Sequence, residues 1–314
     1  MYLHFFHERG TDVPTQSPTV LGMIGQGRMG LPMTELLRSA GHPVVAYDLN
    51  PAFSDVDDLA SLAQRLGAPG TRKVWTMLAE SITGETITTL STLLSSGDIV
   101  INGANDYPRN DIKYAEILAR FGISYLDVGV SGGVLGGREG PDSGYALSVG
   151  GSIDVVSQLM PIFESLKPAG PFGFSHAGTR IGDGHAAKLV HNLIEYALMA
   201  ALGEGYTMLK ALGLDIQAVL NGWRNGTIIQ SRLLDLLSEG LDAGSGSLAR
   251  FSPHVPNGGS GREAMMLALQ NQVPMPVCAA ALQSRFVSCD ERFDAQRAQN
   301  ELRWFFGEHR DALA

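Results

Sequence analysis

Short hydrophobic runs alternate with longer stretches of helical periodicity from Thr19 onward. The runs are a few residues long and rich in β-forming side chains, which is typical of strands buried in a parallel sheet. The stretches between them, such as residues 29–40 and 111–121, show helical patterns. This alternation predicts right-handed βαβ units. Strands are expected at residues 19–24, 43–47, 73–77, 98–102, 124–128 and 145–149.

The pattern changes after residues 167–184, a segment rich in glycine and proline. Beyond it the strand patterns disappear, and long helical patterns continue to the C-terminus. Residues 240–261 are dense in glycine, serine and proline, and predict a long loop within this helical half. We therefore expect an N-terminal extension at residues 1–17, an α/β domain with a doubly wound, mostly parallel sheet at 18–181, and an all-α domain at 182–314.

Composition and charge narrow the class of protein. A chain of 314 residues, 44% hydrophobic and 18% charged, fits an ordered globular protein of two domains. The formal net charge is −9 and no long run of lysine and arginine occurs, so we expect no nucleic-acid partner. We find neither an apolar stretch of about 18 residues that predicts a membrane span nor a signal peptide. Cys278 and Cys289 lack the spacing of a zinc site and suit a cytoplasmic location.

A glycine-rich turn follows the first predicted strand. Gly25, Gly27 and Gly30 form a G-x-G-x-x-G motif where the strand meets the first helix. In a Rossmann fold the first glycine permits the tight turn, the second lets the backbone approach a pyrophosphate, and the third allows close packing of helix on strand. The anion then lies at the helix N-terminus. The predicted cofactor-binding residues of this turn are Gly25, Gln26, Gly27, Arg28, Met29 and Gly30.

An acidic residue ends the second predicted strand. Asp48 lies 18 residues beyond Gly30, where a carboxylate accepts hydrogen bonds from the ribose diol of NAD. Its charge repels the 2′-phosphate of NADP, and no arginine follows it at residues 49–51. The alternative is an ordinary acidic residue that closes a strand. Beside the glycine motif, Asp48 favours NAD as the cofactor of a Rossmann domain.

A polar stripe marks a helix in the second half of the chain. Lys188, His191, Asn192, Glu195 and Tyr196 lie at i, i+3, i+4, i+7 and i+8, and therefore share one face of a helix. Apolar residues surround the stripe, so we expect the helix to be largely buried. A desolvated lysine can act as a general base, because burial lowers its pKa, and a glutamate can supply a proton. A structural ion pair or a solvated helix face is the alternative explanation.

These motifs resemble the 6-phosphogluconate dehydrogenases, in particular their short, often NAD-linked form. The resemblance extends through most of the chain, and the order and spacing of its parts make it specific. The matching segments are GMIGQGRMG at 22–30, DIVINGAN at 98–105, DVGVSGG at 127–133, GHAAKLVHNLIEY at 184–196 and RWFFGEH at 303–309.

The resemblance implies an activity. A member of this family oxidises the hydroxyl β to the carboxylate of 6-phospho-D-gluconate, releases carbon dioxide from the β-keto acid, and protonates the enediol to give ribulose 5-phosphate. The reaction reduces the nicotinamide cofactor and requires no metal. By position, Lys188 resembles the general base of the family and Glu195 resembles the acid that protonates the enediol.

The resemblance also implies which residues bind the substrate. The positions that hold the sugar acid near the nicotinamide are matched by Asn105, Ser131, Gly132, Gly133, His191 and Asn192, of which Asn105 also belongs to the cofactor site. The positions that bind the phosphate are matched by Tyr196, Arg285, Arg303 and His309. Since the tail arginine and histidine of the family reach the neighbouring subunit, the resemblance implies a homodimer with shared active sites, in which the helical domain serves substrate binding and dimerisation.

Two departures from the family pattern concern the substrate pocket. Residues 136–144 form a longer segment than is usual. Where the long family form has a lysine beside a Thr-Gly-Lys-Trp run, this chain has Gly258, Ser260, Gly261, Arg262 and Glu263. The same chemistry on a modified sugar acid is therefore an alternative.

Two further alternatives share the predicted fold. A β-hydroxyacid dehydrogenase of the 3-hydroxyisobutyrate type has a similar Rossmann start, a Ser-Gly-Gly, and a helix lysine followed four residues later by asparagine. His191, Glu195 and the tail at 303–309 favour the decarboxylating enzyme. A catalytically silent nucleotide-binding protein is disfavoured because Lys188 and Glu195 are both present.

Overall fold

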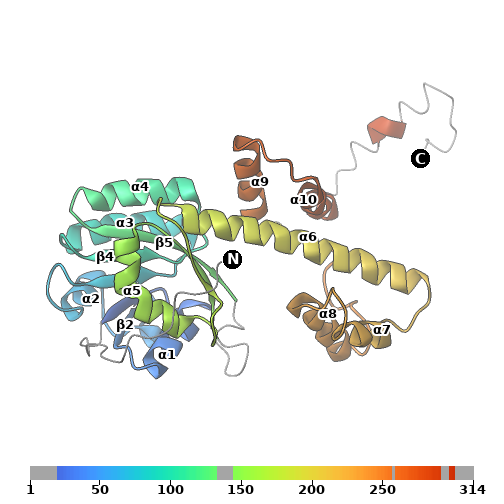
Figure 1. Ribbon diagram of the computed structural model, residues 1–314, viewed down its shortest axis with the longest axis horizontal. Helices are drawn as coiled ribbons and strands as arrows, with labels where there is room; N and C mark the ends of the chain where they lie inside the picture. Colours follow the sequence, from blue (N-terminus) through green and yellow to red (C-terminus); the bar gives the residue numbers. More distant parts are fainter. Residues whose placement is uncertain (1–19, 133–143, 257–258, 291–296, 301–314) are drawn as a thin grey trace, which may run out of the picture. The chain divides into compact units, whose positions relative to one another are not determined.

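The computed structural model describes residues 20–132, 144–256, 259–290 and 297–300 (Figure 1). The chain divides into two compact units, Met1–Lys188 and Leu189–Ala314. The boundary predicted between residues 181 and 182 lies just before helix α6 (Asp183–Ala211), whereas the compact units divide within that helix. The predicted extension at residues 1–17 lies outside the described residues.

A seven-stranded sheet forms the centre of the first unit. Its strand order is β2-β1-β3-β4-β5-β6-β7, and every neighbouring pair is parallel except β5 and β6. The strands are β1 Leu21–Ile24, β2 Val44–Tyr47, β3 Lys73–Thr76, β4 Ile99–Asn102, β5 Ser124–Ser131, β6 Ala146–Gly150 and β7 Phe174–Gly178. The predicted fold class, a mostly parallel α/β domain followed by a helical domain, is confirmed.

The last strand of this sheet was not among the six that the sequence predicts. Strand β7 lies inside the glycine- and proline-rich segment at residues 167–184 and pairs in parallel with β6. The sequence of β7, FSHAG, lacks the continuous hydrophobic run of the other strands, and its side chains are intermediate or exposed. An edge strand with one free side does not need a buried sequence, so pattern alone missed it.

Helices cover both faces of the sheet (Figure 1). Helices α1 (Gly30–Ser39) and α5 (Ile153–Leu166) pack on one face. Helices α2 (Leu59–Arg65), α3 (Glu80–Leu93) and α4 (Pro108–Ala119) pack on the other. Because both faces are covered, the strands are hydrophobic throughout rather than alternating. A short 3-10 helix, η1 (Pro51–Phe53), follows β2.

The core under α1 and α5 contains the largest buried side chains. Trp75 on β3 is fully buried and meets the ring of Phe163 on α5 edge-on, with ring centroids 6.0 Å apart. Phe163 also stacks on Phe174 of β7 at 5.4 Å. Through Phe163, these contacts join β3 in the middle of the sheet to β7 at its edge.

The regular elements among the described residues of the second unit are helices. Beyond α6 they form α7 (Ile216–Trp223), α8 (Arg232–Ala243), α9 (Ser260–Gln270) and α10 (Pro276–Ser288). One core of this unit consists of Leu209, Leu220, Leu234 and Leu241 from α6, α7 and α8. The loop predicted at 240–261 is shorter than expected, because α8 continues to Ala243 and α9 begins at Ser260.

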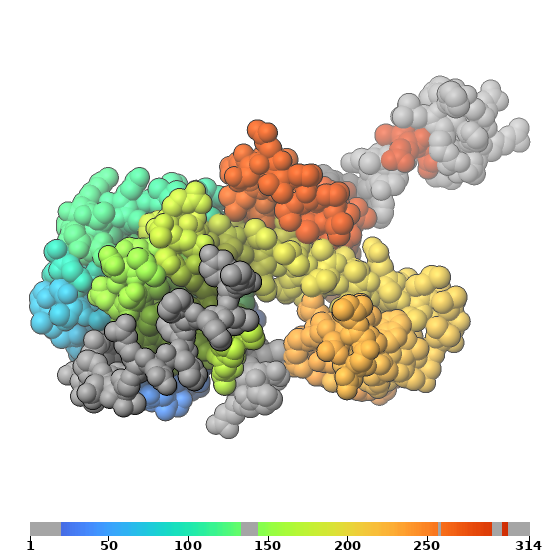
Figure 2. Space-filling model, viewed as in Figure 1, coloured from blue at the N-terminus to red at the C-terminus, as the bar shows by residue number. Residues whose placement is uncertain are grey.

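Helix α6 is less buried than its apolar sequence predicts. Leu189 and Leu193 are buried, but Val190 is 43% and Ile194 is 47% exposed. The apolar positions surround the helix, so not all of them are buried. Figure 2 shows the chain in space-filling form, with α6 in yellow. Within the described residues, no helix is both long enough and apolar enough to cross a membrane.

Candidate active site

The three glycines of the predicted cofactor turn differ in their surroundings. A Cβ added at Gly25, where φ is +92°, would lie 2.6 Å from the Met77 carbonyl oxygen. A Cβ added at Gly30 would lie 1.8 Å from the Gly25 carbonyl oxygen, so α1 begins in direct contact with the turn. At Gly27, by contrast, the added Cβ would meet no atom within 4 Å. Gly25 and Gly30 therefore build the turn, and Gly27 borders open space.

A cavity of about 440 Å³ opens at the carboxyl ends of β1, β3, β4 and β5. This position is where parallel sheets bind their ligands. Five of the predicted site residues line it, namely Gly27, Arg28, Met29, Asn105 and Lys188. The sequence analysis did not assign the remaining lining residues, which are Met77, Leu78, Ala79, Gly103, Ala104 and Val130. These residues could have been predicted from the sequence, because they lie at or just after the carboxyl ends of β3, β4 and β5.

Asp48 lies at the end of β2 and holds the cofactor turn in place. One carboxylate oxygen accepts a hydrogen bond from the Gln26 backbone N–H at 2.7 Å, and the other accepts one from Asn50 N–H at 2.8 Å. Asp48 also lines a second hollow of about 310 Å³. The residues around that hollow are Tyr47, Asp48, Leu49, Pro51, Ser54, Asp55, Val56 and Asp57. They include three carboxylates and no basic side chain. Carboxylates suit the ribose hydroxyls of NAD, whereas the 2′-phosphate of NADP needs a cation.

Arg38 is a nearby cation that the sequence analysis did not consider. Its guanidinium forms an ion pair with Asp55 and donates to the Val44 carbonyl at 2.9 Å. The same Asp55 carboxylate accepts a hydrogen bond from Ala46 N–H at 2.8 Å. Arg38 is thus engaged in holding β2 to the loop that follows it, so its charge is already compensated.

Lys188 on α6 meets the end of β5. Its Nζ donates a hydrogen bond to Ser131 Oγ at 2.7 Å. Gly132, the next residue, has φ of +128°, which glycine adopts readily. Gly133 lies outside the described residues. Lys188 also lines the cavity bordered by Gly27, so the predicted base and the predicted cofactor turn share one hollow within the first unit.

The next turns of α6 carry the other predicted polar residues. The Nδ1 atom of His191 lies 3.3 Å from Asn192 Oδ1 and 3.8 Å from Glu195 Oε2. The guanidinium of Arg285 on α10 lies 3.5 Å from the ring centroid of Tyr196, in cation-π geometry. A Cβ at Gly261 would approach Tyr196 Cε2 to 2.7 Å, so glycine at that position leaves room for the ring.

The structure therefore supports two groupings of the predicted residues. Lys188, Ser131 and Asn105 belong to the first, with the glycine turn, and Tyr196 with Arg285 forms the second. The predicted phosphate ligands Arg303 and His309 lie outside the described residues.

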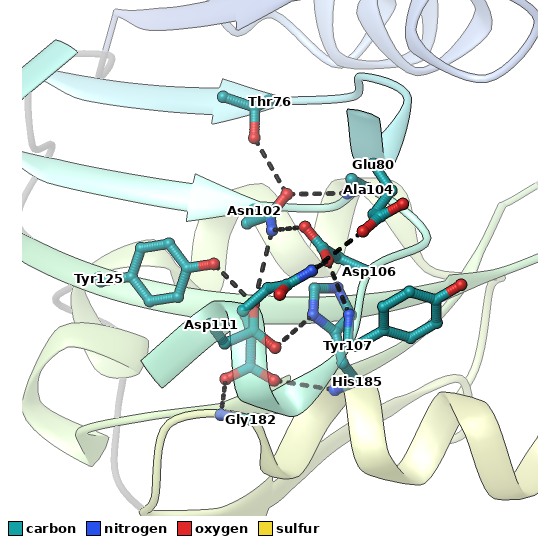
Figure 3. Close-up of polar contacts among 12 residues, drawn as sticks. Thr76, Glu80, Asn102, Ala104, Asp106, Tyr107, Asp111, Tyr125, Gly182 and His185 are labelled. Carbon is teal, nitrogen blue, oxygen red and sulfur yellow. Dashed lines mark hydrogen bonds and ion pairs between the residues drawn. The ribbon is translucent and has the colours of Figure 1, made fainter. Parts of the chain in front are cut away.

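A buried polar cluster near the start of α6 was not predicted as part of the site. Ligand atoms of Asp111, Asp127 and His185 lie within 4.8 Å of one another, a spacing that would suit a metal ion. The hydrogen bonds in Figure 3 argue for another role. Each oxygen of the two carboxylates accepts at least one hydrogen bond from a protein group, and His185 Nδ1 is paired with Asp111, so the cluster is linked internally without an ion. We interpret the cluster as a hydrogen-bonded network.

Comparisons with known families match both units of the chain. Residues 20–169 match the model of the NAD binding domain of 6-phosphogluconate dehydrogenase. Residues 184–310 match the model of the 6-phosphogluconate dehydrogenase C-terminal domain. A similar curated protein is an NAD(+)-dependent, decarboxylating 6-phosphogluconate dehydrogenase from Haloferax volcanii, 36% identical over 302 residues that cover 92% of this chain and 97% of that protein.

Solved structures share the fold. The 6-phosphogluconate dehydrogenase of Plasmodium falciparum has a TM-score of 0.75 at 23% identity, over 91% of this chain and 64% of that longer chain. A 3-hydroxyisobutyrate dehydrogenase from Salmonella typhimurium has a TM-score of 0.65 at 16% identity, over 84% of this chain and 92% of that one. At these identities the structures establish the fold and leave the substrate to be argued from the site.

Proposed function

Because the chain belongs to the 6-phosphogluconate dehydrogenase family, we propose that it oxidises and decarboxylates 6-phospho-D-gluconate with NAD to give ribulose 5-phosphate and carbon dioxide. The observation that carries this proposal is the position of Lys188. Its amine bonds to Ser131 at 2.7 Å and lines the cavity that the cofactor turn borders. A base beside the nicotinamide site is what removal of a hydroxyl proton requires.

Lys188 performs the proton transfers at the oxidised carbon. As the neutral amine it accepts the proton of the substrate hydroxyl, while NAD, when bound, supplies the hydride acceptor. The β-keto acid then loses carbon dioxide, and the ammonium of Lys188 returns the proton to the carbonyl oxygen. Ser131 Oγ holds the amine at this position through its hydrogen bond. The result of these steps is an enediol.

Glu195 completes the reaction by protonating carbon. Two turns beyond Lys188 on α6, it donates a proton to the carbon that carried the carboxylate, while Lys188 takes back the proton of the hydroxyl on the oxidised carbon, which becomes the ketone of the product. His191, at 3.8 Å from the Glu195 carboxylate, orients that group. The supporting observation is that these polar residues follow helical spacing on α6.

The phosphate end of the substrate is assigned to Arg285 and Tyr196. The ring of Tyr196 lies 3.5 Å from the guanidinium, whose terminal nitrogens donate, among the described residues, only long hydrogen bonds, to the Pro256 carbonyl oxygen at 3.4 Å and to Met199 Sδ at 3.5 Å. A phosphate oxygen is a stronger acceptor for these N–H groups than either partner. We further propose that Arg303 and His309 of a second copy of the chain complete this subsite. The functional form is then a homodimer with shared active sites.

The first test follows NADH formation with 6-phosphogluconate and measures carbon dioxide in the same sample. Equal amounts of NADH and carbon dioxide are expected. NADH without carbon dioxide, on 3-hydroxyisobutyrate, would favour a β-hydroxyacid dehydrogenase. Activity confined to another sugar acid would favour a modified substrate, in line with the departures at residues 136–144 and 258–263.

Cofactor choice gives a second prediction. The double substitution Asp48→Ala with Leu49→Arg should lower the NAD to NADP ratio of kcat/KM at least about tenfold. It removes the carboxylate from an acidic hollow and supplies a cation for the 2′-phosphate, and a tenfold change corresponds to about 1.4 kcal/mol. Steady-state kinetics with both cofactors measures the ratio.

The control for this prediction is Asp57→Ala. Asp57 lines the same hollow, whereas Asp48 binds the cofactor turn through Gln26 N–H. Asp57→Ala should therefore change the NAD to NADP ratio of kcat/KM less than the double substitution does. An unchanged ratio in the double variant would contradict the role of Asp48.

A further inference from the structure

The first turn of α6 lies close against β5 and β6 at three glycines. A Cβ at Gly184 would lie 2.6 Å from the Asp127 carbonyl oxygen. A Cβ at Gly150 would lie 2.6 Å from Gly184 N, and a Cβ at Gly129 would lie 2.5 Å from Lys188 Cβ. We call Gly129, Gly150 and Gly184 the three-glycine contact. It brings the helix that carries the base as close to the sheet as backbone atoms permit.

The carboxylate of Asp127 binds the start of this helix. It is fully buried, and its two oxygens accept hydrogen bonds from Gly182 N–H at 2.6 Å and His185 N–H at 2.8 Å. Backbone N–H groups in the first turn of a helix have no partner within the helix, so a carboxylate placed there satisfies them. Burial raises the pKa of Asp127, and the nearby Asp111 carboxylate raises it further, while His185 and the two N–H groups oppose the rise.

His185 connects Asp127 to the rest of the cluster. Its side chain is 1% exposed, and Nδ1 lies 2.8 Å from Asp111 Oδ2. Asp111 is itself held by the Tyr125 hydroxyl, which donates to its other oxygen at 2.7 Å. Burial alone lowers the pKa of His185, but the carboxylates of Asp111 and Asp127 outweigh it and raise the pKa above its usual value. Figure 3 shows the side chain of His185 beside Asp111.

Three successive same-face positions of β5 contact α6. Asp127, Gly129 and Ser131 alternate with residues of the other face, and they meet the helix start, the Lys188 Cβ and the Lys188 Nζ respectively. Contacts at both ends of the segment determine where the helix lies on the strand and in which direction it runs. His185 precedes Lys188 by three residues, about 4.5 Å along the axis.

We propose that Asp127 and His185 are positioning residues, which hold the first turn of α6 on β5 so that Lys188 Nζ stays at Ser131 Oγ. The inference rests on the proposed role of Lys188 as the base. Neither residue touches the reacting atoms, and their effect on catalysis is through the place of the lysine amine. A misplaced base loses rate even when cofactor binding is intact.

Asp98 offers a matched control within the same sheet. It too is a fully buried carboxylate that accepts backbone N–H groups, from Gly70 at 2.7 Å, Arg72 at 2.8 Å and Ser95 at 2.8 Å. It immediately precedes β4 and lies at the amino end of that strand, whereas the cavity lies at the carboxyl ends of the strands. Replacement of Asp98 therefore measures the loss of a buried carboxylate without any change at Lys188.

The experiment compares Asp127→Asn, His185→Asn and Asp98→Asn in the full chain, at a temperature where circular dichroism shows all three folded. Asparagine at 127 keeps one acceptor and turns an NH₂ group toward a backbone N–H. We expect kcat to fall at least tenfold in the Asp127 and His185 variants, with KM for NAD within about twofold of the parent. Asp98→Asn should lower Tm but keep kcat within about twofold. A common loss of kcat in all three variants, or in none, would overturn the proposal.

A second readout does not depend on the substrate. Each lysine of the chain, Lys73, Lys113, Lys167, Lys188 and Lys210, can be followed by amine labelling and mass spectrometry. Asp127→Asn should change the labelling rate of Lys188 at least threefold. Asp98→Asn should change that of Lys73 instead, whose pKa is lowered by burial and held up by Asp98.

The two readouts separate the possible failures. If the parent protein does not oxidise 6-phosphogluconate but Lys188 labelling responds to Asp127→Asn, the positioning role stands and the proposed substrate is wrong. If Lys188 labelling is the same in the parent and in Asp127→Asn, the positioning role is wrong whatever the activity.

Discussion

Substitution of Lys188 by methionine is expected to lower kcat for 6-phosphogluconate about 10³-fold, since loss of a positioned general base costs two to four orders of magnitude. Methionine keeps most of the length of the side chain and loses the amine that meets Ser131 at 2.7 Å. The lysine lines the cavity rather than the hydrophobic core, so the variant should fold and bind NAD. Single-turnover kinetics and NAD titration measure the two quantities separately.

Two further variants make this result specific. Lys210→Met removes an exposed lysine from the last turn of the same helix and should leave kcat unchanged. Lys188→Arg keeps the positive charge but cannot release a proton near neutral pH, so it should be as slow as the methionine variant. Near-normal turnover of Lys188→Arg would mean that the lysine acts as a cation and not as a base.

Gly30→Ala should lower the stability of the protein, whereas Gly27→Ala should weaken cofactor binding and leave stability unchanged. Gly30→Ala gains about 1 kcal/mol of helix propensity, but its Cβ would lie 1.8 Å from a backbone oxygen that cannot move aside. Such overpacking costs about 3 kcal/mol or more, and we expect Tm to fall by roughly 10 °C. Gly27→Ala adds a methyl group to open space and should leave Tm unchanged.

The same pair tests where the pyrophosphate binds. The open side of Gly27 is where we place it, so the added methyl group should weaken NAD binding at least about tenfold. Calorimetric titration with NAD and thermal unfolding of both variants supply the measurements. A Gly27→Ala protein with normal NAD affinity would move the pyrophosphate away from this turn.

Most of the fold followed from the sequence because the strands of a covered parallel sheet are continuous hydrophobic runs. All six predicted strands occur, with bounds that differ by three residues or fewer. The exception, β7, is a half-exposed edge strand whose place depends on its pairing with β6. The exposure of Val190 and Ile194 on α6 was also not predicted, because hydrophobic periodicity does not show what a helix packs against.

Within the site, the residues that could be predicted are those whose role depends on local sequence. The glycine turn, Asp48 and the polar stripe from Lys188 all depend on spacing along one segment. The partners of His185 could not be predicted, because Asp127 and Asp111 precede it by 58 and 74 residues. Only the packing of α4, β5 and α6 in three dimensions brings these buried charges together.

The three-glycine contact limits which substitutions this chain can accept. A Cβ added at Gly184 would lie 2.5 Å from the Ser148 carbonyl oxygen and 2.6 Å from the Asp127 carbonyl oxygen. Shortening a neighbouring side chain does not move a backbone oxygen, so a second substitution nearby should not rescue a larger residue at Gly184. Redesign of the substrate pocket of this chain is therefore best directed at residues outside the contact, such as Tyr196, Gly261 and Arg285.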